Sequence, residues 1–63
     1  MTMTMTAEQA MEYIFNEIDV IATTRDWHFV RGMIEMAWMG GLITNEQRYT
    51  LMTETNRKLT EIA

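Results

Sequence analysis

The single histidine, His28, is the first residue to consider for chemistry, because carboxylates lie near it in the sequence at Asp26 and Glu35. A histidine and a carboxylate act as general acid and base when they share a cleft and one orients the other. On a helix, His28 falls on a narrow polar strip beside Arg31 and Glu35, which predicts an exposed and solvated ring. Serine and cysteine, the commonest nucleophiles, do not occur in the chain. We therefore expect a protein that is not an enzyme.

The spacing of possible metal ligands is also unfavourable. The residue one helical turn after His28 is a glycine, so no ligand pair forms on that helix face. Glu8 and Glu12 stand one turn apart, but a di-metal carboxylate bundle also requires Glu-x-x-His motifs, which the chain lacks. Gly40 and Gly41 are not followed by the lysine of a phosphate-binding loop and are typical of a helix end. The sequence predicts no metal and no other cofactor.

The acidic side chains of residues 1–24 are more suggestive. This segment carries all of the net charge of -4, because the acidic and basic side chains of residues 25–63 cancel. Glu8, Glu12 and Asp19 fall within about 40° of one another on a helical wheel. Such a stripe can attract a basic groove on another protein, and the same pattern also suits a solvated outer face. Since the chain has no basic cluster that would bind phosphates, direct nucleic-acid binding is not expected.

The richest apolar stretch covers residues 27–39 and reads WHFVRGMIEMAWM. If this stretch is helical, its apolar side chains fill an arc of roughly 200°, about twice the width of an ordinary core-facing stripe. The helix must then be covered on two sides, either by the other helices of the chain or by a second protein. We assign Trp27, Met33, Ile34 and Trp38 to the core or to self-association.

Four further apolar residues are candidates for a protein-binding surface. Tyr13 and Val20 lie on the side of the first expected helix away from its main apolar seam, and Phe29 and Met36 lie at the outer edge of the second. Methionine and aromatic side chains are typical of adaptable protein interfaces. A broad core in so small a domain would bury the same residues, so both interpretations stay open at this stage.

Capping residues and a glycine pair predict where the helices that position these residues begin and end. A threonine followed three residues later by glutamine or aspartate, which is typical of N-terminal capping, occurs before each of three periodic segments. The second segment ends at a pair of glycines, which favours a helix stop. The first helix is expected to open at Thr6 and to end near Ala22, and a connection of about two to four residues leads to the second helix, which runs to about Met39. The third is expected from Thr44 to Ile62.

The third expected helix is the weakest amphipath. Met52 and Leu59 lie near the centre of its apolar face, Leu51 lies toward the margin, and Thr55 and Asn56 interrupt the face. We expect Asn56 to be half exposed at a helix crossing. The alternative is a buried polar residue that fixes register or oligomeric state.

The length of 63 residues allows one domain. We predict an all-α, compact three-helix unit with the second helix in the centre, in which residues 1–5 form a frayed lead and residues 6–63 a single domain. Cysteine is absent, so neither disulfides nor thiolate-bound zinc can stabilise so small a core. We therefore expect a homo-oligomer or a subunit of another complex. The missing cover for the second helix would lie on its side facing the third helix, or at its outer edge.

The apolar runs and the N-terminal residues indicate where the protein is located. No apolar run approaches the roughly 20 residues that span a bilayer, and the N-terminal residues do not read as a signal peptide. We expect a cytoplasmic protein that does not contact a membrane.

Residues 39–47, MGGLITNEQ, join one helix to the next capped helix through a GLIT turn. Over residues 37–57 this joint resembles one found in many short proteins of bacteriophages and other mobile elements. The resemblance implies a small accessory protein that acts in the host cytoplasm by binding a protein partner. This group includes inhibitors of bacterial defence systems such as anti-CRISPR proteins. The alternative function is a homo-oligomeric structural or regulatory helical module.

Overall fold

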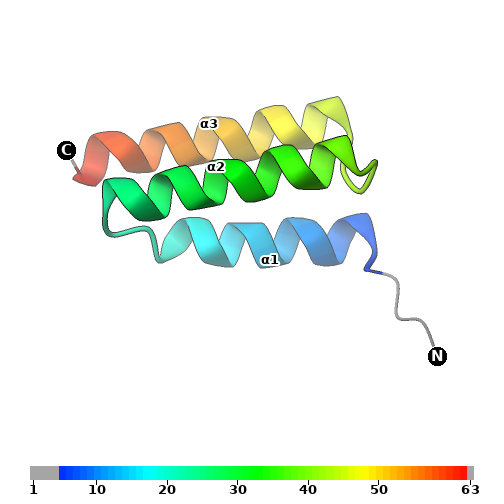
Figure 1. Ribbon diagram of the computed structural model, residues 1–63, viewed down its shortest axis with the longest axis horizontal. Helices are drawn as coiled ribbons and strands as arrows, with labels where there is room; N and C mark the ends of the chain where they lie inside the picture. Colours follow the sequence, from blue (N-terminus) through cyan, green and yellow to red (C-terminus); the bar gives the residue numbers. More distant parts are fainter. Residues whose placement is uncertain (1–4, 63) are drawn as a thin grey trace.

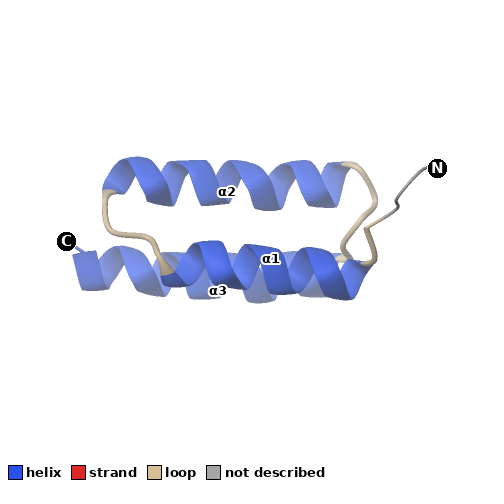
Figure 2. Cartoon of the chain, turned by 90° about the horizontal axis from the view of Figure 1, so that it is seen from below, coloured by secondary structure: helices blue, strands red, loops and turns tan. Residues whose placement is uncertain are grey.

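The computed structural model describes residues 5–62, which form three helices: α1 (Ala7–Asp19), α2 (Thr24–Met39) and α3 (Asn45–Ile62). Figure 1 shows α2 between α1 and α3, and the view in Figure 2 shows α1 and α3 together on the side opposite α2. Every pair of helices is in contact, so the described chain is a triangular bundle. The all-α three-helix prediction is confirmed. Of the predicted N-terminal lead, only Met5 belongs to the described residues.

Each helix begins directly after the threonine that the sequence predicts as its cap. The threonine hydroxyl accepts a hydrogen bond from the amide three residues later, and the side chain of that later residue accepts one from the threonine amide. A capping residue stabilises a helix by about 0.5–2 kcal/mol. Because the two residues of each pair are only three positions apart, neighbouring residues determine where each helix begins. The three reciprocal pairs are Thr6 with Gln9, Thr23 with Asp26, and Thr44 with Gln47.

The first helix ends earlier than its apolar seam predicts. It stops at Asp19, although Ile21 continues the seam and is buried in the turn that follows. The cap of α2 explains the early end, because the carboxylate of Asp26 accepts hydrogen bonds from the amides of Ala22 and Thr23. Those residues are therefore used to start α2 and do not extend α1.

The core consists of aliphatic side chains from all three helices and both connections. Ile34, which we assigned to the core or to self-association, is fully buried in it. Gly41 follows α2 and has a φ of 75°, which lies in the left-handed region that favours glycine. The chain turns there, and the residues after it return to the core. The buried apolar residues are Ala10, Ile14, Ile18, Ile21, Val30, Ile34, Ile43 and Leu51.

The buried face of α3 differs from the predicted one. Leu51 and Thr55 are fully buried, whereas Met52 and Leu59, which we expected at the centre, are half-buried. Thr55 can be buried because its hydroxyl donates a hydrogen bond of 2.7 Å to the carbonyl of Leu51. Asn56 is exposed and takes no place in the core.

Candidate protein-binding groove

The side of α2 that faces α3 is closed by contacts within the chain. The indole Nε1 of Trp27 donates a hydrogen bond of 3.0 Å to the carbonyl of Thr55, and that of Trp38 donates one of 2.6 Å to Oδ1 of Asn45. Trp27 is half-buried, and Trp38 lies at the edge of the helix pair. Both tryptophans thus connect α2 to α3.

One arginine, Arg48, completes this α2–α3 contact, and a second, Arg31, stacks on Trp27 within α2. Arg48 reaches Glu35 with an N–O distance of 2.6 Å, and its guanidinium lies 4.6 Å from the ring centre of Trp38. The guanidinium of Arg31 lies 4.8 Å from the ring centre of Trp27. Such stacking of arginine on indole is favourable and covers the rings. The sequence left two sides of α2 without an expected cover. The α3 helix of the same chain covers one of them.

The outer edge of α2 stays uncovered. Phe29 is 65% exposed and Met36 is 71% exposed, although both are large apolar side chains. Tyr13 on α1 and Val20, which directly follows α1, are also more than half exposed. Of the two interpretations left open for these four residues, the structure places them at the surface and outside the core.

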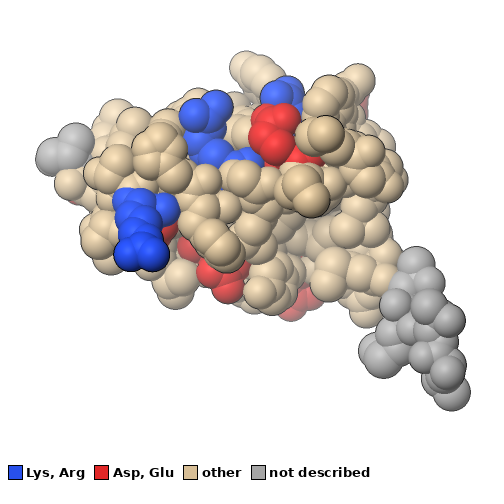
Figure 3. Space-filling view, in the orientation of Figure 1, with Lys and Arg blue, Asp and Glu red and all other residues tan. Residues whose placement is uncertain are grey.

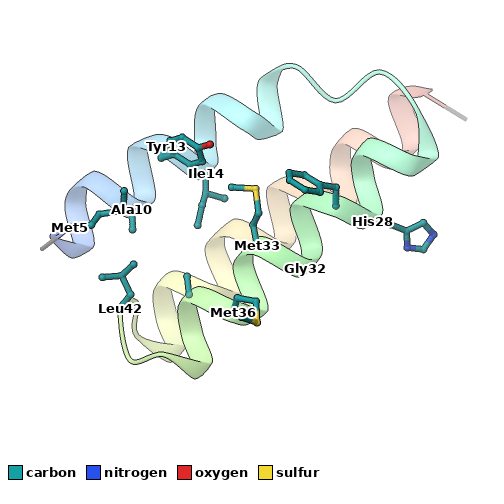
Figure 4. A pocket seen from close by; sticks show the side chains of 11 residues that line it. Met5, Ala10, Tyr13, Ile14, His28, Gly32, Met33, Met36 and Leu42 are labelled. Atoms are coloured by element: carbon teal, nitrogen blue, oxygen red, sulfur yellow. The ribbon is translucent and has the colours of Figure 1, made fainter. Parts of the chain in front are cut away.

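A groove of about 650 Å³ lies between α1 and α2. Figure 4 shows Tyr13 and Ile14 from α1 on one wall and Met33 and Met36 from α2 on the other, while Met5 and Leu42 lie toward one end. Met33 is half-buried and packs against the core, so it belongs to both the core and the groove. The groove brings together Tyr13, Phe29 and Met36, three of the predicted binding residues.

Gly32 is the groove residue that the sequence interpretation missed as part of a site. It lies inside α2 and lines the groove, yet a Cβ atom added to it would meet no atom within 4 Å. A glycine within a helix destabilises it by about 0.5–1 kcal/mol relative to alanine. No packing within the chain requires this glycine, so the space above it is free for another molecule.

Glu8, Glu12 and Asp19 are exposed on α1, and none of them lines the groove. They point to another side of α1, because consecutive residues of a helix are about 100° apart and Glu12 directly precedes Tyr13. Figure 3 shows acidic side chains along the lower edge of the molecule, where α1 lies. Within residues 5–62, no ion pair involves these three carboxylates. The predicted acidic and apolar residues therefore form two separate surfaces, an apolar groove between α1 and α2 and an acidic stripe elsewhere on α1.

His28 and its neighbouring carboxylates do not form an acid–base site. His28 is among the residues that line the groove (Figure 4), and its imidazole packs edge-on against Trp27 at 4.8 Å between ring centres. Asp26 is used in the cap of α2, where the amide of Ala22 and the cap itself hold the pKa of its carboxyl below the usual value. Glu35 is paired with Arg48.

The described part of the chain contains no group of three or more histidine, cysteine or acidic residues placed to hold a metal ion. None of its three helices combines the length and the hydrophobicity needed to cross a membrane.

Comparison with known proteins gives no matching family model, curated protein or solved structure.

Proposed function

We propose that the protein is a small, non-enzymatic binding protein that holds a segment of another polypeptide in the α1–α2 groove. The observation that supports this proposal is the groove itself, which exposes Tyr13, Phe29 and Met36 although the chain has only 63 residues. Exposed apolar surface of this kind lowers the solubility of a protein and is typical of sites where proteins associate. Methionine side chains adapt their shape to a partner, which favours this use of the groove.

The shape and charge of this surface favour a helical partner. A groove between two antiparallel helices accepts the apolar face of a third helix, whose side chains enter it at spacings of three and four residues. Basic residues of the partner outside that helix would meet Glu8, Glu12 and Asp19, since these carboxylates have no ion pair within the described residues. The proposed partner therefore supplies an amphipathic helix to the groove and basic residues to the acidic stripe.

The resemblance of residues 37–57 to short phage and mobile-element proteins supports a more specific role. We propose that the protein acts in the cytoplasm of a bacterial host and blocks a defence protein by occupying such a helix. The groove is the proposed inhibitory site, and the acidic stripe aids the approach to the target.

Photo-crosslinking in bacterial cells tests the groove. A photoreactive phenylalanine analogue replaces Phe29, and in a matched control it replaces Tyr49, which lies on α3 and is 74% exposed. We expect a protein cross-linked from position 29 and not from position 49. The same product should be lost when Met36→Glu is added and retained when Tyr49→Glu is added instead. Equal products from both positions would contradict the proposal.

Charge reversal tests the acidic stripe separately. The triple change of Glu8, Glu12 and Asp19 to lysine should weaken capture of the cross-linked partner, and added salt should weaken capture by the original chain. Unchanged capture would remove the stripe from the proposed mechanism and leave the groove in place.

A homo-oligomeric module is the second candidate function. It is supported by the size of the uncovered apolar face relative to the small core, which contains eight buried aliphatic residues among residues 5–62. Domains of this size gain stability when association buries further apolar area.

A further inference from the structure

The apolar face made by α1 and α2 is large enough to hold a folded partner. Five exposed apolar side chains of α1, its C-cap and α2 each leave half to three quarters of their surface uncovered. Together they expose roughly 600 Å² at the usual sizes of such side chains, and the smaller stable interfaces bury about 600 Å² on each partner. These residues are Tyr13, Val20, Phe29, Met36 and Met39.

The spacing along α2 suits packing against another helix. Arg25, Phe29, Gly32, Met36 and Met39 follow one another at intervals of four, three, four and three residues, which is the spacing of a helix-packing seam. Gly32 is in the middle of this seam and has free space above it. A large side chain of an opposing helix can enter the space that the missing Cβ leaves. Tyr13, on the other wall of the groove, is a side chain of that size.

The charge pattern decides how two copies of this face can meet. A face pairs with itself about a two-fold axis, which runs either across the helices or along them. An axis across the helices would place α1 on α1, and each α1 carries four carboxylates and no basic residue. An axis along the helices places α1 of one copy over α2 of the other. The second arrangement avoids placing acidic helices against each other.

Asp19 and Arg25 become complementary in this second arrangement. They flank the turn between α1 and α2, so both lie at the same end of the bundle. Neither makes an ion pair within the described chain, and the last turn of α1 has no basic residue to complement its helix dipole. With the axis along the helices, Arg25 of each copy lies near Asp19 of the other.

We infer that two copies of the chain pair through their α1–α2 faces, with Tyr13 of each copy packed over Gly32 of the other. This inference rests on the proposed function, because it takes the groove to be a protein-binding site. The dimer covers the groove, so self-association and capture of another protein compete. The pairing thereby regulates the site, since a partner must displace the second copy.

Sedimentation equilibrium of the full chain across micromolar concentrations tests the pairing. We expect a reversible dimer whose dissociation constant rises roughly tenfold or more in Tyr13→Gln. Tyr49→Gln, which removes an exposed tyrosine from α3, is the matched control and should leave the constant unchanged. Gly32→Gln should also weaken the dimer, while circular dichroism shows that the monomer keeps its helices. A monomer at all concentrations, or a dimer weakened only by Tyr49→Gln, would overturn the inference.

A charge swap tests the arrangement of the two copies. Asp19→Arg and Arg25→Glu should each weaken the dimer, and the double variant should restore it. Both single changes place favourable charges at helix ends, so weaker pairing cannot be attributed to unfolding. A double variant as weak as the singles would overturn the arrangement of α1 over α2.

The two proposals fail independently in these experiments. A strict monomer that still cross-links a partner from position 29 would remove the dimer and keep the binding function. A dimer that captures no other protein would remove the binding function and leave self-association.

Discussion

Gly32 and Gly41 are two glycines of the α2 region with opposite structural roles. Gly32 has helical geometry and open space around its Cα, so alanine there removes only a helix penalty. We expect Gly32→Ala to raise the free energy of unfolding of the monomer by about 0.5–1 kcal/mol. Gly41 has a φ of 75°, so Gly41→Ala should lower the free energy of unfolding by about 1–2 kcal/mol. Urea denaturation at low protein concentration measures both, and a loss of stability in both variants would contradict this account.

Ile34 and Met36 are two residues apart on α2 but have opposite environments. Ile34 is fully buried, as is Ile18 on α1, and truncation of either to alanine should cost about 2–5 kcal/mol. Met36 faces the groove, so Met36→Ala should change the stability of the monomer by less than about 0.5 kcal/mol. Thermal or urea denaturation compares the three variants. A cost for Met36→Ala similar to that for Ile34→Ala would mean that the groove face belongs to the core.

At the scale of the helices, the cap of α2 gives the bundle a pH dependence. The carboxylate of Asp26 accepts hydrogen bonds from Ala22 and Thr23, which lower its pKa from 3.8. A group whose pKa is lower in the folded state contributes its full stability above its unfolded pKa and loses it as pH falls toward the folded value. Helix α2 should therefore lose stability below about pH 4.

Asp26→Asn tests this cap. Asparagine caps helices without an ionisable group, so the variant should lose part of the fall in melting temperature between neutral pH and pH 3. Circular dichroism measures the melting curves of both chains. If the two chains respond equally to pH, other carboxylates would account for the whole acid response.

The helices differ in how much of them the sequence reveals. All three starts and the end of α2 were predicted correctly, because caps and glycine stops involve residues at most four positions apart. The end of α1 was predicted too late, since the apolar seam continues through Ile21 while the hydrogen bonds already belong to the next helix. The buried face of α3 was wrong because Thr55 satisfies its own hydroxyl on Leu51, which makes a polar residue suitable for the core.

At the scale of the whole molecule, the groove was only partly predictable. Helical periodicity placed Tyr13, Val20, Phe29 and Met36 outside the main seams, and the structure leaves them exposed. The role of Gly32 was hidden, because helical periodicity indicates only a position facing solvent, and the groove that Gly32 lines forms when α1 packs against α2. The closure of α2 by α3 was equally hidden, since Arg48 meets Glu35 and Trp38 across a connection that brings separate helices together.

The distribution of methionine divides the molecule into two parts with different sensitivity to oxidants. The buried apolar core contains alanine, valine, leucine and isoleucine, and every described methionine is exposed or half-buried. Met5, Met33 and Met36 line the groove itself. Oxidation converts the thioether into a polar sulfoxide, which is unfavourable in an apolar contact.

Mild peroxide treatment should therefore weaken groove binding and pairing while the helical circular dichroism signal stays nearly unchanged. Methionine sulfoxide reductase should restore binding, and Met36→Leu should make binding less sensitive to peroxide. Unfolding at the same degree of oxidation would contradict this separation. The fully buried aliphatic residues of the core do not react with peroxide, and the methionines at the binding face are open to reversible inactivation.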